Sequence, residues 1–214
     1  MKAIKATAIL SNGFVSYDPM SPAIDSMIGY LYTIGKDSDL VSPCGELSTH
    51  DDLPIEKEFD GDDWWYQCSM PIYYAATDHV RYFHRRFDAQ YAERYMENVR
   101  GKIATSSGPT KNFRLSSIVH VCDSVSWHLV CDDWCVESLP KLTHIGARTG
   151  AGEGRVIRWE FDDGDAEIAR THRPLPSEWA TRNNINGYNI YWGYRPPVRL
   201  SCNKTICTVP RGAA

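Results

Sequence analysis

The chain has 214 residues, a formal net charge of −4 and 43% hydrophobic residues, which is the composition of a globular protein. It contains no apolar stretch long enough for a membrane helix, and its first ten residues do not resemble a secretory leader. We therefore expect a cytoplasmic protein with no membrane partner. The small negative charge also argues against a protein that coats nucleic acid through charge alone.

The first third of the chain predicts a strand, a helix and an acidic segment. Residues 3–10 favour a strand. A helix ending near Gly35 is indicated by apolar residues that recur on one helical face, namely Ile24, Met27, Ile28 and Leu31. Residues 36–63 are rich in turn formers, and residues 40–63 hold eight acidic residues against one lysine. This segment is predicted to be a surface loop or small insertion.

The remaining elements are less regular. Residues 78–100 keep roughly helical spacing of aromatic and apolar side chains. Residues 118–122 and 126–130 favour two strands joined as a hairpin. Asp132 or Asp133 can cap a following helix, and residues 155–161 favour a last strand.

Without the insertion, the predicted order is strand, helix, strand, strand, helix, strand. This order is typical of the ferredoxin-like fold, an α+β arrangement that RNA-recognition modules also use. We predict a ferredoxin-like core over residues 1–165, with the acidic insertion around 36–63. Residues 166–214 hold seven basic residues against two acidic ones, and we expect them to form a basic, irregular C-terminal extension packed on the core.

Seven cysteines allow two interpretations. Cys131 and Cys135, together with Cys202 and Cys207, have spacings that a four-thiolate zinc site can use. Neither spacing is the two-residue knuckle that is typical of such sites, so small buried side chains are the favoured interpretation. No cofactor is predicted.

A glycine-rich loop is the most informative feature of the sequence. Four glycines fall within nine residues, between the second predicted helix and the last strand: Gly146, Gly150, Gly152 and Gly154. Such a loop lets another chain approach the backbone, and successive amides can bind an anion. Arg148 and Arg155 can add charge-assisted hydrogen bonds. The alternative is a mobile connection without a ligand.

Nucleotide cofactors are not favoured by this loop. A dinucleotide-binding fingerprint follows a strand and precedes a helix, whereas here the order is reversed. A P-loop needs Gly-Lys-Ser or Gly-Lys-Thr, which the loop lacks.

The loop sequence also carries a resemblance. Residues 145–160 read Ile-Gly-Ala-Arg-Thr-Gly-Ala-Gly-Glu-Gly-Arg-Val-Ile-Arg-Trp-Glu. This stretch resembles the repeat-associated (RAMP) superfamily of CRISPR-associated proteins, and more narrowly the type IV group of the Cas family numbered five. Shorter matches lie at residues 24–26, 83–87, 108–111 and 194–197.

The resemblance implies a non-catalytic subunit of a type IV CRISPR effector complex that holds the 5′ handle of the guide RNA and caps the backbone filament. The implied partners are the guide RNA, the backbone and large subunits, and, indirectly, target DNA. The RNA contacts are assigned first to the loop, namely Gly146, Arg148, Gly150, Gly152, Gly154 and Arg155. A second tier of RNA contacts comprises Arg81, His84, Arg85, Arg86, Lys111 and Arg114.

Two alternatives stay open. Related RAMP proteins include metal-independent endoribonucleases that process repeat RNA with a histidine, and histidine suits proton transfer near neutral pH. The available histidines are His79, His84, His120, His128 and His144. Of these, His120 and His128 lie in predicted strands, where a structural role is expected. The third interpretation is an assembly scaffold whose basic face binds protein.

Overall fold

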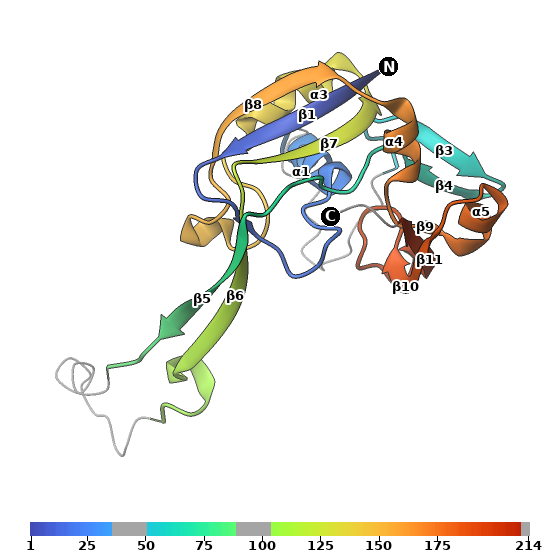
Figure 1. Ribbon diagram of the computed structural model, residues 1–214. Coiled ribbons are helices and arrows are strands. Elements are labelled where there is room, and N and C mark those ends of the chain that lie inside the picture. Colours follow the sequence, from blue (N-terminus) through green and yellow to red (C-terminus); the bar gives the residue numbers. More distant parts are fainter. Residues whose placement is uncertain (36–50, 89–103, 211–214) are drawn as a thin grey trace.

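The computed structural model describes residues 1–35, 51–88 and 104–210. Helices and antiparallel sheets form a body, and a long two-stranded arm projects from it (Figure 1). The predicted α+β class is confirmed.

The main sheet has β1 (Lys2–Leu10) at its centre, antiparallel to β7 (Ser124–Cys131) and β8 (Val156–Asp163). Every second residue of β1 from Ile4 to Leu10 is buried, as expected of a strand with one covered face. Helices α1 (Ile24–Gly35) and α3 (Asp133–Ser138) supply residues to the same core. The predicted strands at 3–10 and 155–161 and the predicted helix ending near Gly35 are therefore present.

Helix α3 begins where its capping residue predicts. The Asp132 carboxylate accepts a hydrogen bond from the Trp134 amide at 3.0 Å, which satisfies one of the free amides of the first turn.

At the free edge of β7, the main sheet is extended by an irregular segment of chain. Residues 55–72 run along β7 through isolated bridges that pair Ile55 with Cys131, Cys68 with Leu129 and Ile72 with Ser126. These residues form no continuous ladder with β7, so the ferredoxin-like assignment stays a prediction.

The arm consists of β5 (Thr77–Arg85) and β6 (Phe113–Val121), with β2 (Phe14–Val15) pairing at the base of β6. Two predictions were wrong here. Residues 77–85 form a strand rather than a helix, and β6 pairs with β5 and β2 instead of forming a hairpin with β7. The apolar spacing was misleading because Val80 and Phe83 lie on opposite sides of an exposed strand. The rest of the predicted helix, residues 89–100, lies outside the described residues.

The acidic segment was also only partly predicted. β3 (Lys57–Asp60) and β4 (Asp63–Tyr66) form a hairpin that turns at Gly61, whose φ is +63°. The loop alternative was therefore wrong for residues 57–63, and the alternative of a small insertion stays a prediction. Residues 36–50 lie outside the described residues.

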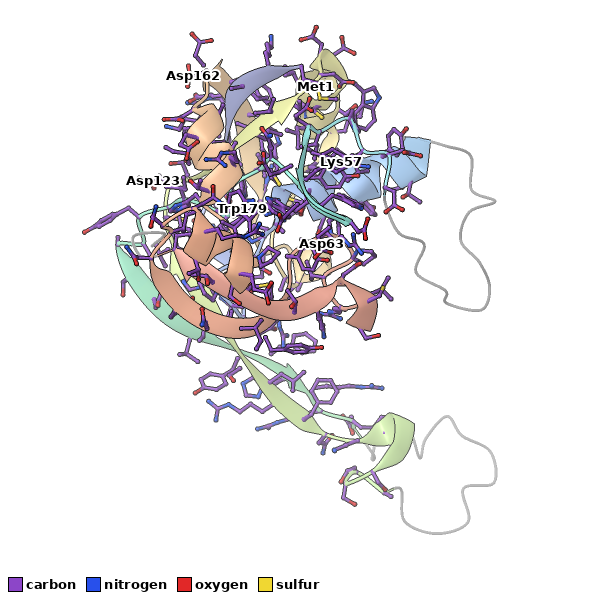
Figure 2. The ribbon with its side chains drawn as sticks, turned by 90° about the vertical axis from the view of Figure 1, so that its right-hand side faces the viewer. Met1, Lys57, Asp63, Asp123, Asp162 and Trp179 are labelled. Atoms are coloured by element: carbon purple, nitrogen blue, oxygen red, sulfur yellow. The ribbon has the colours of Figure 1, made fainter. Side chains whose placement is uncertain are left out.

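The C-terminal extension is regular, contrary to expectation. It contains α4 (Ala166–Thr171), α5 (Ser177–Arg182) and a sheet in the order β10 (Gly187–Gly193), β11 (Lys204–Pro210), β9 (Leu175–Pro176). These elements are short and were hidden by prolines and polar residues. Trp65 of β4 packs edge-on against Trp179 of α5 at 5.0 Å between ring centroids, in a second core. Figure 2 labels Trp179.

A buried arginine joins three parts of the body. Arg173 is 5% exposed, and its guanidinium donates to the Asp25 carboxylate at 3.2 Å and to the backbone oxygens of Cys68 and Tyr194 at 3.2 and 2.7 Å. Helix α1, the irregular edge segment and the C-terminal extension therefore meet at one cation.

The cysteines do not support the zinc interpretation. Cys131 and Cys135 are buried in the main core, whereas Cys207 belongs to the second core and Cys202 is exposed. Across the described ranges, no cluster of histidine, cysteine or acidic side chains is arranged to hold a metal ion. In those same ranges no helix has the length and apolarity needed to cross a membrane.

Candidate nucleic-acid interface

The two ends of the glycine-rich loop are held by the body. Ile145 donates its amide to Gly154 O at 2.8 Å, and Ala147 donates to Val15 O at 2.8 Å. A Cβ atom at Gly154 would lie 1.8 Å from Ile145 O, and one at Gly146 would lie 2.6 Å from Val15 O. Both glycines also have positive φ. Gly146 and Gly154 are therefore required by the packing of the chain on itself.

The tip of the loop is different. Gly150 and Gly152 are exposed, and a Cβ atom at either position would meet open space. The tip forms a short 3₁₀ turn, Thr149–Ala151, that begins after Arg148 in the left-handed conformation. Within the part of the chain that the structure describes, the amides of Thr149 and Gly150 have no hydrogen-bond partner. Those amides are available to an external acceptor.

The loop forms one wall of a cleft of about 820 Å³. Residues 15–23 and the first turns of α1 also line the cleft. Two exposed tyrosines, Tyr17 and Tyr30, line this space, together with the hydroxyls of Ser26 and Thr143. Such a mixture of aromatic rings, hydroxyls and free amides suits a nucleotide-like ligand.

The cleft favours an anion. Lys141 and Arg199 line it, and among the described residues neither has an acidic partner within 4.0 Å. The one lining carboxylate, Asp18, already accepts hydrogen bonds from the Met20 amide and the Ser21 hydroxyl at 3.0 and 3.1 Å. Among the described residues, the positive charge that lines the cleft is therefore not paired with acidic side chains.

The two loop arginines have different surroundings. Arg148 donates from Nε to the Tyr17 hydroxyl at 3.0 Å, and its guanidinium lies 5.8 Å from the centre of the Phe83 ring. The hydrogen bond from Arg148 lowers the pKa of Tyr17. Arg155 is exposed and bridges to His144 through the backbone, beyond the tip. The structure thus places Arg148 between loop and arm, and Arg155 beside the cleft wall.

The basic residues of the arm divide between its two sides. Strand alternation puts Arg81, Phe83 and Arg85 on one side, and Arg81 and Phe83 contact the loop residues Glu153 and Arg148. We call this the loop-facing side. His84 and Arg114 lie on the opposite, outer side, where Arg114 stacks on the Tyr82 ring at 3.7 Å. The second-tier residues predicted from the sequence therefore do not converge on one surface.

Arg86 directly follows β5 and Lys111 shortly precedes β6, so both lie at the far end of the arm, where both are exposed. Sequence reasoning missed Tyr17, Tyr30, Lys141 and Arg199 in the cleft. The basic balance of residues 166–214 was a signal for Arg199, although it did not specify a position.

The histidines also separate into groups. His120 pairs with Asp78 at 2.8 Å and packs on Phe14, and His128 accepts the Asp165 amide at 2.9 Å. Both histidines thus lie in strands, as expected, and have partners there, while their structural role stays a prediction. His79 and His84 are exposed on the arm, whereas His144 lines the cleft, with Nδ1 3.0 Å from the Thr143 hydroxyl.

Comparison with known proteins identifies the class of protein to which the chain belongs, the CRISPR-associated proteins of type IV. The family model that matches residues 3–205 is described as CRISPR type IV associated protein Csf3, and the chain belongs to this family. The resemblance to the type IV group of the Cas family numbered five is confirmed. A comparison with curated proteins returned no match. Family membership places the chain in a type IV CRISPR complex with other Cas components.

Proposed function

We propose that the chain holds the 5′ handle of the guide RNA in the cleft beside the glycine-rich loop, and that it caps the backbone filament of the complex without cleaving RNA. The observation that carries this proposal is that, among the described residues, the amides at the loop tip and the cations of the same cleft have no partner. A polynucleotide supplies the matching phosphates, and base pairing by the guide then reads target DNA.

The cleft chemistry favours a single strand over a duplex. Tyr17 and Tyr30 are exposed and can stack on unpaired bases, a contact that tolerates many sequences. The hydroxyls around them can hydrogen-bond to ribose 2′-hydroxyls, which distinguish RNA from DNA. Because a handle is a short single-stranded end, it fits this site better than a helical region does.

Cross-linking tests the proposal. The chain is co-expressed with the other subunits of its complex and a repeat–spacer RNA, and the purified particle is irradiated and digested. Peptides from residues 15–30 and 141–150 should carry nucleotides of the 5′ handle. Handle cross-links that fall only outside these segments would remove the cleft from the interface. A particle that assembles without this chain touching RNA would contradict the function itself.

An endoribonuclease is the second candidate, because His144 lines the same cleft beside the Thr143 hydroxyl. Its imidazole can take a proton from a 2′-hydroxyl in a metal-independent cleavage. Incubating the purified chain with repeat RNA in EDTA separates the two candidates. The binding proposal predicts intact RNA, whereas discrete cleavage that disappears in His144→Ala would establish the nuclease.

A further inference from the structure

One carboxylate stands at the junction between the arm and the loop. Glu153 follows the loop tip, and its Oε1 lies 2.5 Å from Nη1 of Arg81 on the loop-facing side of β5. The two residues are 72 positions apart, so the ion pair joins the arm to the loop directly. The nearby contact of Arg148 with Phe83 joins the same two segments.

The two partners differ in their access to solvent. The Glu153 side chain is 13% exposed, whereas that of Arg81 is 55% exposed. An incoming phosphate can therefore approach the guanidinium from its solvent side, where it meets the carboxylate as a rival for the same cation. Phosphate offers the same planar arginine a charge-assisted hydrogen bond, so the two anions compete for one cation.

We propose that Glu153 is an internal competitor of the RNA backbone: it occupies Arg81 while RNA is absent and thereby sets the affinity for the guide. The inference rests on the proposed function. In the free protein the carboxylate holds the arm against the loop. In the complex a phosphate replaces it on Arg81, and the negative charge of Glu153 stays close to the strand.

Two physical effects then lower RNA affinity. The Arg81–Glu153 pair must open before Arg81 can bind a phosphate, although a pair this exposed is weak and opens readily. The released carboxylate also repels the phosphate that replaced it, and this repulsion is appreciable because the two negative charges are only a few ångströms apart. Removing the charge of Glu153 while keeping its shape should therefore strengthen binding.

A double-mutant cycle on the full-length chain tests this inference. The probe is a fluorescent RNA with the repeat-derived 5′ handle, and Kd is measured for wild type, Glu153→Gln, Arg81→Gln and the double variant. We expect Glu153→Gln to bind about three- to fivefold tighter at low salt, with the gain shrinking as salt rises. Arg81→Gln should bind more weakly, and adding Glu153→Gln to it should restore little.

The matched control is Glu167→Gln. Glu167 pairs with Arg170 at 2.9 Å within α4, so its loss removes a similar ion pair away from the loop. Its RNA affinity should equal that of wild type. Far-UV circular dichroism and urea unfolding of each variant show that the fold is kept.

The outcomes separate the two claims. If wild type binds the handle RNA but Glu153→Gln binds equally or more weakly, the competition is contradicted and the proposed function stands. The competition is also contradicted, and the proposed function stands, if Glu153→Gln tightens binding by the same factor in the Arg81→Gln variant as in wild type. If wild type does not bind the RNA at all, both claims are overturned.

Discussion

The body and the arm treat charged and apolar side chains in opposite ways. In the body, Arg173 is buried and surrounded by acceptors from three segments, and Val125 of β7 is fully buried. In the arm, all nine residues of β5 are exposed, including Val80 and Phe83 (Figure 2). The body's charged and apolar side chains are buried against other parts of the chain, whereas those of β5 in the arm leave much of their surface exposed.

An exposed two-stranded hairpin gains little stability by itself. The arm is held at its base by β2 and, through Arg81 and Arg148, by the loop. Substitutions in the body should therefore change the free energy of unfolding, whereas substitutions in the arm and at the loop tip should change binding.

The largest effect is expected at Arg173. Arg173→Ala leaves the Asp25 carboxylate buried without its cation, and also frees the carbonyls of Cys68 and Tyr194. We expect the free energy of unfolding to fall by about 3–5 kcal/mol, measured by urea titration. Arg158→Ala, which removes an exposed arginine paired with Glu160, serves as control and should change it by less than about 0.5 kcal/mol. Similar losses for both would contradict the role of Arg173.

The second largest effect is expected when a glycine at the end of the loop is replaced rather than one at its tip. Gly154→Ala places a methyl group against Ile145 O at a backbone φ of +69°, so we expect a loss of about 3 kcal/mol from clash and strain together. Gly152→Ala has a similar φ of +84° but open space, and should lose about 1 kcal/mol. Thermal and urea unfolding measure both. Equal losses would mean that close packing does not distinguish the ends of the loop from its tip.

Acid should weaken the body through two neighbouring histidines. Burial lowers the pKa of His172, with a further contribution from His128, and burial together with Lys5 lowers the pKa of His128. These histidines therefore bind protons more readily in the unfolded chain than in the folded one. The free energy of unfolding falls as the pH drops below about 6.5. The loss of unfolding free energy between pH 7.5 and 5.5 should be smaller in His172→Gln. An unchanged pH profile in that variant would exclude His172 as a source.

The smallest effect is expected on the outer side of the arm. Ile118 is 44% exposed in β6, and Ile118→Thr keeps a β-branched side chain, so unfolding free energy should change by less than about 0.5 kcal/mol. A related replacement in the body, Val125→Thr, buries a hydroxyl and should cost about 1–3 kcal/mol. A large loss for Ile118→Thr would show that the arm is part of the folded core.

The predictable parts of the fold are those with local signals. The α1 periodicity, the Asp132 cap and the strands at residues 3–10 and 155–161 follow from short patterns whose burial agrees with them. Strand β5 of the arm could not be found this way. Its apolar residues are exposed on both sides, so they lack the alternation of a half-buried strand, and their roughly helical spacing favoured a helix instead.

The candidate site was also predictable only where it carries a local sequence signal. Glycine clustering is visible in sequence and indicated the loop, but only the structure separates Gly146 and Gly154, which pack on the chain, from Gly150 and Gly152, which face open space. The cleft itself joins residues 15–30, 141–150 and Arg199. No local pattern predicts such a long-range meeting. The role of the loop in binding RNA stays a prediction.

Gly150 provides the most direct test of the central claim that the loop tip grips RNA. Gly150→Leu fits the backbone and meets open space, so the fold should be unchanged, but the side chain would occupy the cleft wall. Ala151→Leu adds the same side chain in the same turn without lining the cleft and is the matched control. We predict that handle-RNA affinity falls at least about tenfold in Gly150→Leu and stays near wild type in Ala151→Leu. Wild-type affinity in a folded Gly150→Leu would contradict the account.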